Sequence, residues 1–271
     1  METNPQLELA FNFLEYTGTS IFLTGKAGTG KTTFLRELKR RSPKRMIVVA
    51  PTGVAAINAG GVTIHSFFQL PFGPYVPGRT EENRSGEKRF NHKFGREKIN
   101  IIRSMDLLVI DEISMVRAYI IDFMDNVLRV YCRNMREPFG GKQLLLVGDI
   151  FQLEPVVKED DRRLLNPFYR SSFFFDAKVF EYFKLVSIEL KKVYRQSDPV
   201  FISILDHIRT SQVPMQDFQR LNQRVGARLD EGDSKLAITL STRRDTVDYI
   251  NDSQLQRLPG EPCLFRGHIQ G

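Results

Sequence analysis

The stretch from Gly25 to Thr32, with the sequence GKAGTGKT, constrains this chain more than any other feature. It fits the pattern G-x-x-x-x-G-K-[ST] at every fixed position. The short apolar run 20–24 before it predicts a strand, and apolar residues at helical spacing over 31–41 predict a helix. Glycines let backbone N–H groups curl around phosphate oxygens, and a helix N-terminus adds partial positive charge. The sequence therefore predicts a phosphate-binding loop, and this context argues against a chance match.

The side chains of this loop are of the types that bind a nucleoside triphosphate and magnesium. Lys31 is expected to reach the β- and γ-phosphates, and the hydroxyl of Thr32 is expected to bind Mg²⁺. The other loop residues that we expect to hold the nucleotide are Gly28, Thr29, Gly30 and Thr33.

Composition places the chain among ordinary globular proteins. Its 271 residues are 41% hydrophobic, enough for one large or two ordinary domains. A net charge of +7 mildly favours a polyanionic partner, although a basic protein that binds no nucleic acid remains compatible with it. The two cysteines, Cys132 and Cys263, form no metal or disulfide pattern.

Nothing in the sequence predicts a signal peptide, and no apolar run approaches the ~20 residues that span a bilayer. We therefore expect an intracellular protein without membrane contact. It would lie in the cytoplasm or nucleoid of a bacterium, or in the nucleus or mitochondrion of a eukaryote.

Strand and helix patterns alternate along most of the chain. Short apolar segments predict strands at 20–24, 46–50, 107–110, 143–147 and 185–190, and those at 107–110 and 143–147 are unbroken runs, typical of strands covered on both faces. Helices are expected near 5–16, 31–41, 53–58 and 116–135. This alternation predicts an α/β fold with a mostly parallel, doubly wound sheet. Residues 70–95 are rich in Pro, Gly and charge and predict a long loop.

The pattern changes from about residue 198. Two helices, 198–210 and 214–224, precede the apolar run 236–240 and a further helix that Thr242 is expected to cap. We expect a first domain over 1–197 and the start of a second α/β domain over 198–271, a length below that of a typical domain.

Polar residues directly follow several of the predicted strands. In a parallel α/β sheet, ligands bind in a crevice at the carboxyl ends of the strands. Asp111 and Glu112 come directly after strand 107–110. Asp111 is expected to hold Mg²⁺ through water, and Glu112 to orient and deprotonate the water that attacks the γ-phosphate. The alternative for the pair alone is an acidic surface turn.

Gln152 and Arg195 complete the predicted catalytic set. Gln152, after the strand 143–147, is expected to reach the γ-phosphate or the attacking water. Arg195, after the strand 185–190, is expected to neutralise charge on the transferred phosphoryl group. A polar turn residue and a salt-bridged arginine are the alternatives. The N-K-x-D element of GTPases and the L-S-G-G-Q element of ATP-binding cassettes do not occur.

Taken in order, these motifs resemble those of superfamily-one helicases of the B group, and more narrowly of the PIF family. The segments that carry the resemblance are 25–32, 50–56 (APTGVAA), 63–67 (TIHSF), 111–115 (DEISM), 148–152 (GDIFQ) and 194–196 (YRQ). The segment 125–143 resembles the one that separates PIF enzymes from RecD-like relatives. The resemblance covers about 1–197 strongly and 236–251 weakly.

The resemblance implies a RecA-like fold and a 5′-to-3′ DNA helicase. Such an enzyme couples ATP hydrolysis to movement along single-stranded DNA, with nucleotide bound between two RecA-like domains. It also implies that Gln6, in the opening helix, contacts adenine; a solvent-facing helix residue is the alternative. Single-stranded DNA and DNA junctions are the implied partners of a monomer.

Several residues are candidates for DNA contacts. A helix N-terminus at Thr52 and Gly53 could hold a backbone phosphate, and His65 could donate to another. Phe72 lies in a Pro-flanked loop and is a better candidate for base stacking than Phe67 or Phe68, which lie in an apolar run. In the second domain, Thr242 and Arg243 could hold a further phosphate, although the family more often has Thr-Asn there.

The family's further second-domain motifs, including another arginine that faces the nucleotide, do not occur before Gly271. We therefore expect a fragment that binds ATP and Mg²⁺ but unwinds DNA poorly or not at all. Two other functions stay open: an ATP-dependent DNA-binding switch or loader that does not translocate, and a nucleic-acid-binding module with a vestigial phosphate loop.

Overall fold

A computed structural model of the chain describes residues 4–70, 73–75, 93–227, 237–261, 263–265 and 267. The chain divides into two compact units, the first ending at Val213 and the second beginning at Pro214. Helix α8 (Pro199–Arg209), which we expected to open the second domain, lies in the first unit. The assignment of the remainder to an incomplete second RecA-like domain stays a prediction.

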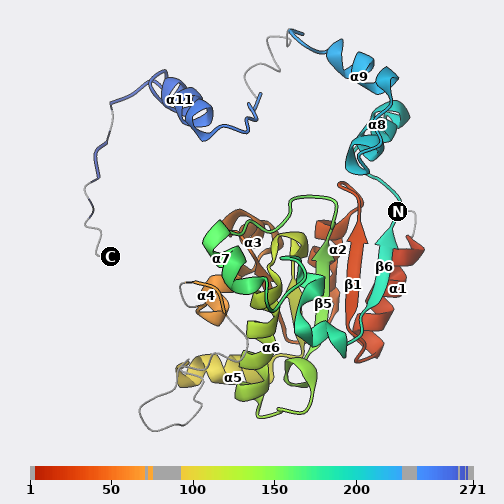
Figure 1. Ribbon diagram of the computed structural model, residues 1–271, viewed down its shortest axis with the longest axis vertical. Helices are drawn as coiled ribbons and strands as arrows, with labels where there is room; N and C mark the ends of the chain where they lie inside the picture. The colour runs from red at the N-terminus through yellow and green to blue at the C-terminus, as the bar shows by residue number, and fades with distance from the viewer. Residues whose placement is uncertain are drawn as a thin grey trace. The chain divides into compact units, whose positions relative to one another are not determined.

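The first unit is built on a six-stranded sheet in the order β3-β2-β4-β5-β1-β6. Figure 1 shows β5, β1 and β6 side by side in this order. The strands are β1 (Ile21–Gly25), β2 (Met46–Ala50), β3 (Val62–Thr63), β4 (Leu107–Ile110), β5 (Gln143–Gly148) and β6 (Val186–Leu190). Every pairing is parallel. The predicted α/β fold is therefore confirmed, and β3 is a short strand that the sequence reasoning missed.

Strand register brings the phosphate loop and two further strand ends to one edge of the sheet. Thr24 pairs with Gly148 of β5, and Gly25 pairs with Leu190 of β6. The segments that follow β1, β5 and β6 therefore leave the sheet at the same level.

The helices of the first unit largely follow the predicted pattern. They are α1 (Pro5–Tyr16), α2 (Lys31–Arg41), α3 (Gly53–Ala59), α4 (Ile64–Phe68), α5 (Arg96–Ser104), α6 (Ala118–Cys132), α7 (Glu159–Leu165) and α8. Helix α6 is shorter than the predicted 116–135, because Arg117 is its N-cap and Arg133 ends it in a left-handed conformation, φ 58°. Most of the predicted loop 70–95 lies outside the described residues.

Two hydrophobic cores cover the two faces of the sheet. Along β4, Leu108 and Ile110 pack in the core that contains α6, whereas Leu107 and Val109 pack in the core that contains α1 and α2. This alternation is the period-two geometry of a strand buried on both sides. The sheet is therefore doubly wound, as the alternation of strand and helix patterns predicted.

The second unit contains helices α9 (Met215–Asn222) and α11 (Arg244–Leu255). The prediction that Thr242 caps the latter is wrong: the N-cap is Arg243, whose N–H donates to Ser241 Oγ at 3.1 Å. The described part of the apolar run, 237–240, contains no strand.

Candidate nucleotide-binding site

The phosphate loop joins β1 to α2. Two of its glycines lie so close to neighbouring atoms that any side chain at these positions would clash. Gly28 has φ +78°, and a Cβ there would lie 2.6 Å from the Cβ of Arg195. A Cβ on Gly25 would lie 2.6 Å from the carbonyl oxygen of Leu190. Gly30, at φ 93°, caps α2 without a side-chain hydrogen bond, so that no side chain competes for the first N–H groups of α2. The loop therefore has the geometry that a phosphate needs.

Lys31 lies at the base of this loop. Its Nζ donates to the carbonyl oxygens of Gly25 at 2.6 Å and Lys26 at 3.0 Å. Burial lowers the pKa of Lys31, while the charges of Asp149, Glu112 and, less strongly, Asp111 raise it. The ammonium thus rests on neutral acceptors, which an anionic phosphate would replace with a stronger, charge-assisted partner.

A cavity of about 400 Å³ opens beside the loop. Its lining residues are Ala27, Gly28, Thr29, Gly30, Lys31, Thr32, Thr33, Glu112, Gln152, Tyr194 and Arg195. The four predicted catalytic residues and every predicted nucleotide ligand except Gln6 therefore meet at one cavity. Their individual roles stay predictions.

The acidic pair follows β4, as predicted. Asp111 is buried, and burial, with the charge of Glu112, raises its pKa to about 6 against the opposing effects of the Glu112 N–H and Lys31. That N–H donates to Asp111 Oδ1 at 3.0 Å. Glu112 itself has φ 51°, which is strained for a residue with a side chain, and it lines the cavity.

A divalent cation would fit this acidic environment, because its charge would favour the ionised form of Asp111, which burial and the charge of Glu112 disfavour. Magnesium is usually held by one or two protein oxygens together with phosphates of the substrate. In the described part of the chain, no group of three or more His, Cys, Asp or Glu residues is placed to hold a metal without such help. Thr32 and Asp111 remain the candidate ligands.

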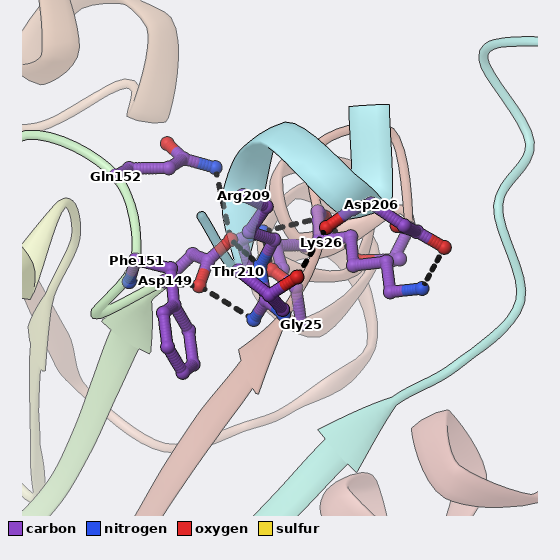
Figure 2. Close-up of polar contacts among 10 residues, drawn as sticks. Gly25, Lys26, Asp149, Phe151, Gln152, Asp206, Arg209 and Thr210 are labelled. Carbon is purple, nitrogen blue, oxygen red and sulfur yellow. Dashed lines mark hydrogen bonds and ion pairs between the residues drawn. The ribbon is translucent and has the colours of Figure 1, made fainter. Parts of the chain in front are cut away.

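Gln152 lies beside an ion pair that sequence reasoning missed (Figure 2). Asp149 follows β5 directly. Its Oδ2 accepts from Arg209 Nε at 2.9 Å, and its Oδ1 accepts from Arg209 Nη2 at 2.8 Å. The Nε2 of Gln152 lies 3.5 Å from Asp149 Oδ2. Asp206 and Arg209 lie three residues apart in a helix, so they share one face. The three-residue spacing could have predicted that Asp206 and Arg209 lie on one face of this helix. It could not have predicted that they pair with Lys26 and Asp149.

Tyr194 and Asn4 were also missed as structural parts of the site. The Tyr194 N–H donates to the carbonyl of Gly28 at 2.8 Å, which holds the segment carrying Arg195 against the phosphate loop. The buried Asn4 donates from Nδ2 to the Tyr194 hydroxyl at 3.1 Å and caps α1 by accepting from the Gln6 N–H at 3.1 Å. Gln6 therefore lies two residues after Asn4, whose side chain is hydrogen-bonded to the cavity-lining Tyr194. Gln6 itself does not line the cavity.

The candidate DNA-binding residues of the first unit lie outside this cavity. Thr52 caps α3, accepting from the Ala55 N–H at 3.2 Å, and the exposed Gly53 begins that helix. His65 is exposed on α4, and partial burial, with the charge of Arg117, lowers its pKa.

The aromatic and second-unit candidates fall into three groups. Phe67 and Phe68 are buried in the core, in agreement with the preference against them, while Phe72 lies outside the described residues. Thr242 and Arg243 are exposed in the second unit, where Arg243 Nε donates to Asp245 Oδ1 at 3.1 Å.

Comparison with known proteins identifies the family. The sequence model of the PIF1-like helicases matches residues 9–227, a range that contains all six strands and the whole cavity. The chain belongs to the PIF1-like helicase family. The expected resemblance is confirmed.

Individual PIF1-like relatives give the same result. The ATP-dependent DNA helicase PIF1 of Emericella nidulans is 35% identical over 262 residues, which are 94% of this chain and 33% of that protein. The human PIF1 is 35% identical over 251 residues, 92% of this chain and 36% of that protein. The chain thus spans about a third of the length of these curated relatives.

Solved PIF1-like structures superpose closely. A Bacteroides Pif1 helicase in complex with ADP-AlF3 and single-stranded DNA matches with a TM-score of 0.82 and 39% identity, over 96% of this chain and 58% of that one. A structure of two coordinating Pif1 helicases at forked double-stranded DNA matches with a TM-score of 0.85 and 41% identity, over 94% of this chain and 58% of that one.

No helix in the described part of this chain is both long and apolar enough to cross a membrane.

Proposed function

We propose that this chain is the motor part of an ATP-dependent DNA helicase, which couples hydrolysis of Mg-ATP to 5′-to-3′ movement along single-stranded DNA. The observation that carries the proposal is the single cavity where Lys31, Glu112, Gln152 and Arg195 meet beside a glycine-rich phosphate loop. Membership of the PIF1-like family supports ATP as the nucleotide.

Five residues that line the cavity, together with the neighbouring Asp111, have chemical tasks in this proposal. Glu112 takes a proton from the attacking water, and Gln152 orients that water. Lys31 and Arg195 neutralise the charge that develops on the phosphate oxygens. Magnesium, held through Thr32 and Asp111, supplies further charge neutralisation when it is bound.

Single-stranded DNA and DNA junctions are the proposed partners of a monomer. Support comes from the relatives solved with single-stranded DNA and at forked double-stranded DNA. Thr52, Gly53 and His65 offer hydroxyl, backbone N–H and imidazole N–H donors for DNA phosphates. Because its pKa is lowered, His65 would act as a neutral donor at neutral pH.

Steady-state ATP hydrolysis, measured with and without oligo-dT, tests this proposal. We expect strong stimulation by oligo-dT in the 271-residue chain and no turnover in the Glu112→Gln variant, which should still bind nucleotide. Absence of nucleotide binding would refute it. Movement on a fluorescently labelled single strand separates a motor from a switch or loader, and strand displacement on a tailed duplex tests the expectation of poor unwinding.

A further inference from the structure

The buried Asp149, which lies next to the cavity-lining Gln152, forms an ion pair with Arg209 (Figure 2). The Asp149 side chain is 1% exposed and that of Arg209 is 17% exposed. Two nearly parallel hydrogen bonds, 2.9 and 2.8 Å long, join the carboxylate to the guanidinium. A buried carboxylate is costly unless it is paired and hydrogen-bonded. Burial raises the pKa of Asp149, but the hydrogen bonds from Arg209 and Phe151, with the charges of Arg209 and Lys31, bring it below its usual value.

The same pair shapes the turn that carries Gln152. Asp149 accepts from the Phe151 N–H at 3.2 Å through Oδ1, and its carbonyl accepts from the Gln152 N–H at 3.0 Å. The guanidinium carbon of Arg209 lies 4.3 Å from the centre of the Phe151 ring, within cation–π range. Arg209 therefore contacts two residues of the turn through two different kinds of interaction.

Helix α8 reaches the phosphate loop as well. Asp206, one turn before Arg209, forms an ion pair with Lys26 of that loop. The carbonyl of Lys26 accepts from the Lys31 Nζ and, at 2.8 Å, from the Thr29 hydroxyl. We call the pairs Lys26–Asp206 and Asp149–Arg209 the α8 clasp.

Two ion pairs contribute to holding α8. Ile204 is the buried side chain of this helix, while Val200, Phe201, Leu205 and Ile208 are exposed large hydrophobic residues. Apolar packing along α8 is therefore only partial. The clasp helps to position α8. It also connects this helix directly to the phosphate loop and to the turn after β5, both of which border the cavity.

We propose that Arg209 is a positioning residue for ATP hydrolysis: it fixes the Asp149–Gln152 turn, so that Gln152 faces the γ-phosphate, and the clasp ties α8 to the phosphate loop. This rests on the proposed function only for the role of Gln152. Arg209 is not among the residues that line the nucleotide cavity, so it acts through Asp149.

Kinetics of three variants test this proposal. Arg209→Gln should lower kcat by about tenfold or more with KM for ATP changed less than about threefold, because Gln152 acts in the transition state. Arg209→Lys should be intermediate, since lysine keeps the charge but not the paired donors. Arg40→Gln is the matched control: Arg40 forms an exposed pair with Glu37 in the last turns of α2, and the substitution should leave both constants unchanged.

A double-mutant cycle with Gln152→Ala separates positioning from general damage. If Arg209 acts through Gln152, Arg209→Gln should slow the Gln152→Ala variant by less than about twofold. Effects that multiply, or an Arg209→Gln variant with unchanged kcat, would overturn the proposal. Thermal unfolding of each variant ensures that all rates are measured on folded protein.

A measurement without nucleotide distinguishes failure of this proposal from failure of the proposed function. In the nucleotide-free chain, Arg209→Gln should speed amide hydrogen exchange in residues 149–152 while Arg40→Gln should not. Unchanged exchange in that turn would overturn the positioning role even if ATP hydrolysis were confirmed. Faster exchange in a chain that hydrolyses no ATP would keep the clasp and refute the function instead.

Discussion

The residues around the nucleotide cavity and those proposed to contact DNA are held in different ways. Lys31 is fixed by two backbone carbonyls, and Asp149 by the partly buried guanidinium of Arg209 and by the Phe151 N–H of its own turn. In contrast, His65 and Arg243 are exposed, and the described side-chain pairing of Arg243 is to Asp245, two residues away. In a preorganised catalytic site a few residues account for most of the rate, whereas on a surface that binds DNA phosphates many residues each contribute a small part of the affinity.

The largest effect that would sharpen this contrast is expected for Arg195→Ala. If Arg195 neutralises charge on the transferred phosphoryl group, the rate of hydrolysis should fall by roughly 10³-fold or more. Single-turnover kinetics would check this. A decrease under tenfold would show that the Arg195 guanidinium does not neutralise the transferred phosphoryl group.

The next effect concerns pH and the buried acid. Because the folded-state pKa of Asp111 is raised to about 6, its contribution to stability is present below its unfolded pKa and is lost as pH rises through about 6. Without nucleotide, Asp111→Asn should therefore stabilise the chain above that pH, by on the order of 2 kcal/mol.

Thermal unfolding of both proteins between pH 4 and 8, without nucleotide or Mg²⁺, would measure this difference. The gain should shrink as pH falls from about 6 toward about 4. A constant difference across that range would show that Asp111 is not the titrating group.

The smallest effects are expected on the DNA side. His65→Ala should weaken binding to single-stranded DNA severalfold, and Arg243→Gln should do so by less, with the salt slope reduced by about 1. Fluorescence anisotropy over a range of salt concentrations would measure both, with Arg40→Gln as a charge-matched control. A loss of 10³-fold from either substitution would break the contrast between the two regions.

The parts of this fold that the sequence predicted are those encoded by neighbouring residues. The strand Leu107–Ile110 and the helix Lys31–Arg41 match the predicted bounds, because apolar runs and helical periodicity are local patterns. Helices α5 and α7 were missed, since they are short and rich in charge.

The parts of the site that were missed depend on pairs far apart in the chain. Arg209 and Asp149 are 60 residues apart, and Asn4 and Tyr194 are 190 apart. Neither residue of such a pair carries a local pattern that identifies its partner. The cavity residues could be predicted because each follows its own strand, and parallel strands place their carboxyl ends together.

A crystal structure with Mg²⁺ and a non-hydrolysable ATP analogue tests the central claim most directly. We predict that the phosphates lie against the glycine loop with Lys31 on the β- and γ-phosphates, the metal between Thr32 and Asp111, and Arg195 facing the γ-phosphate. An analogue bound elsewhere, or this cavity left empty at saturating analogue, would contradict the account.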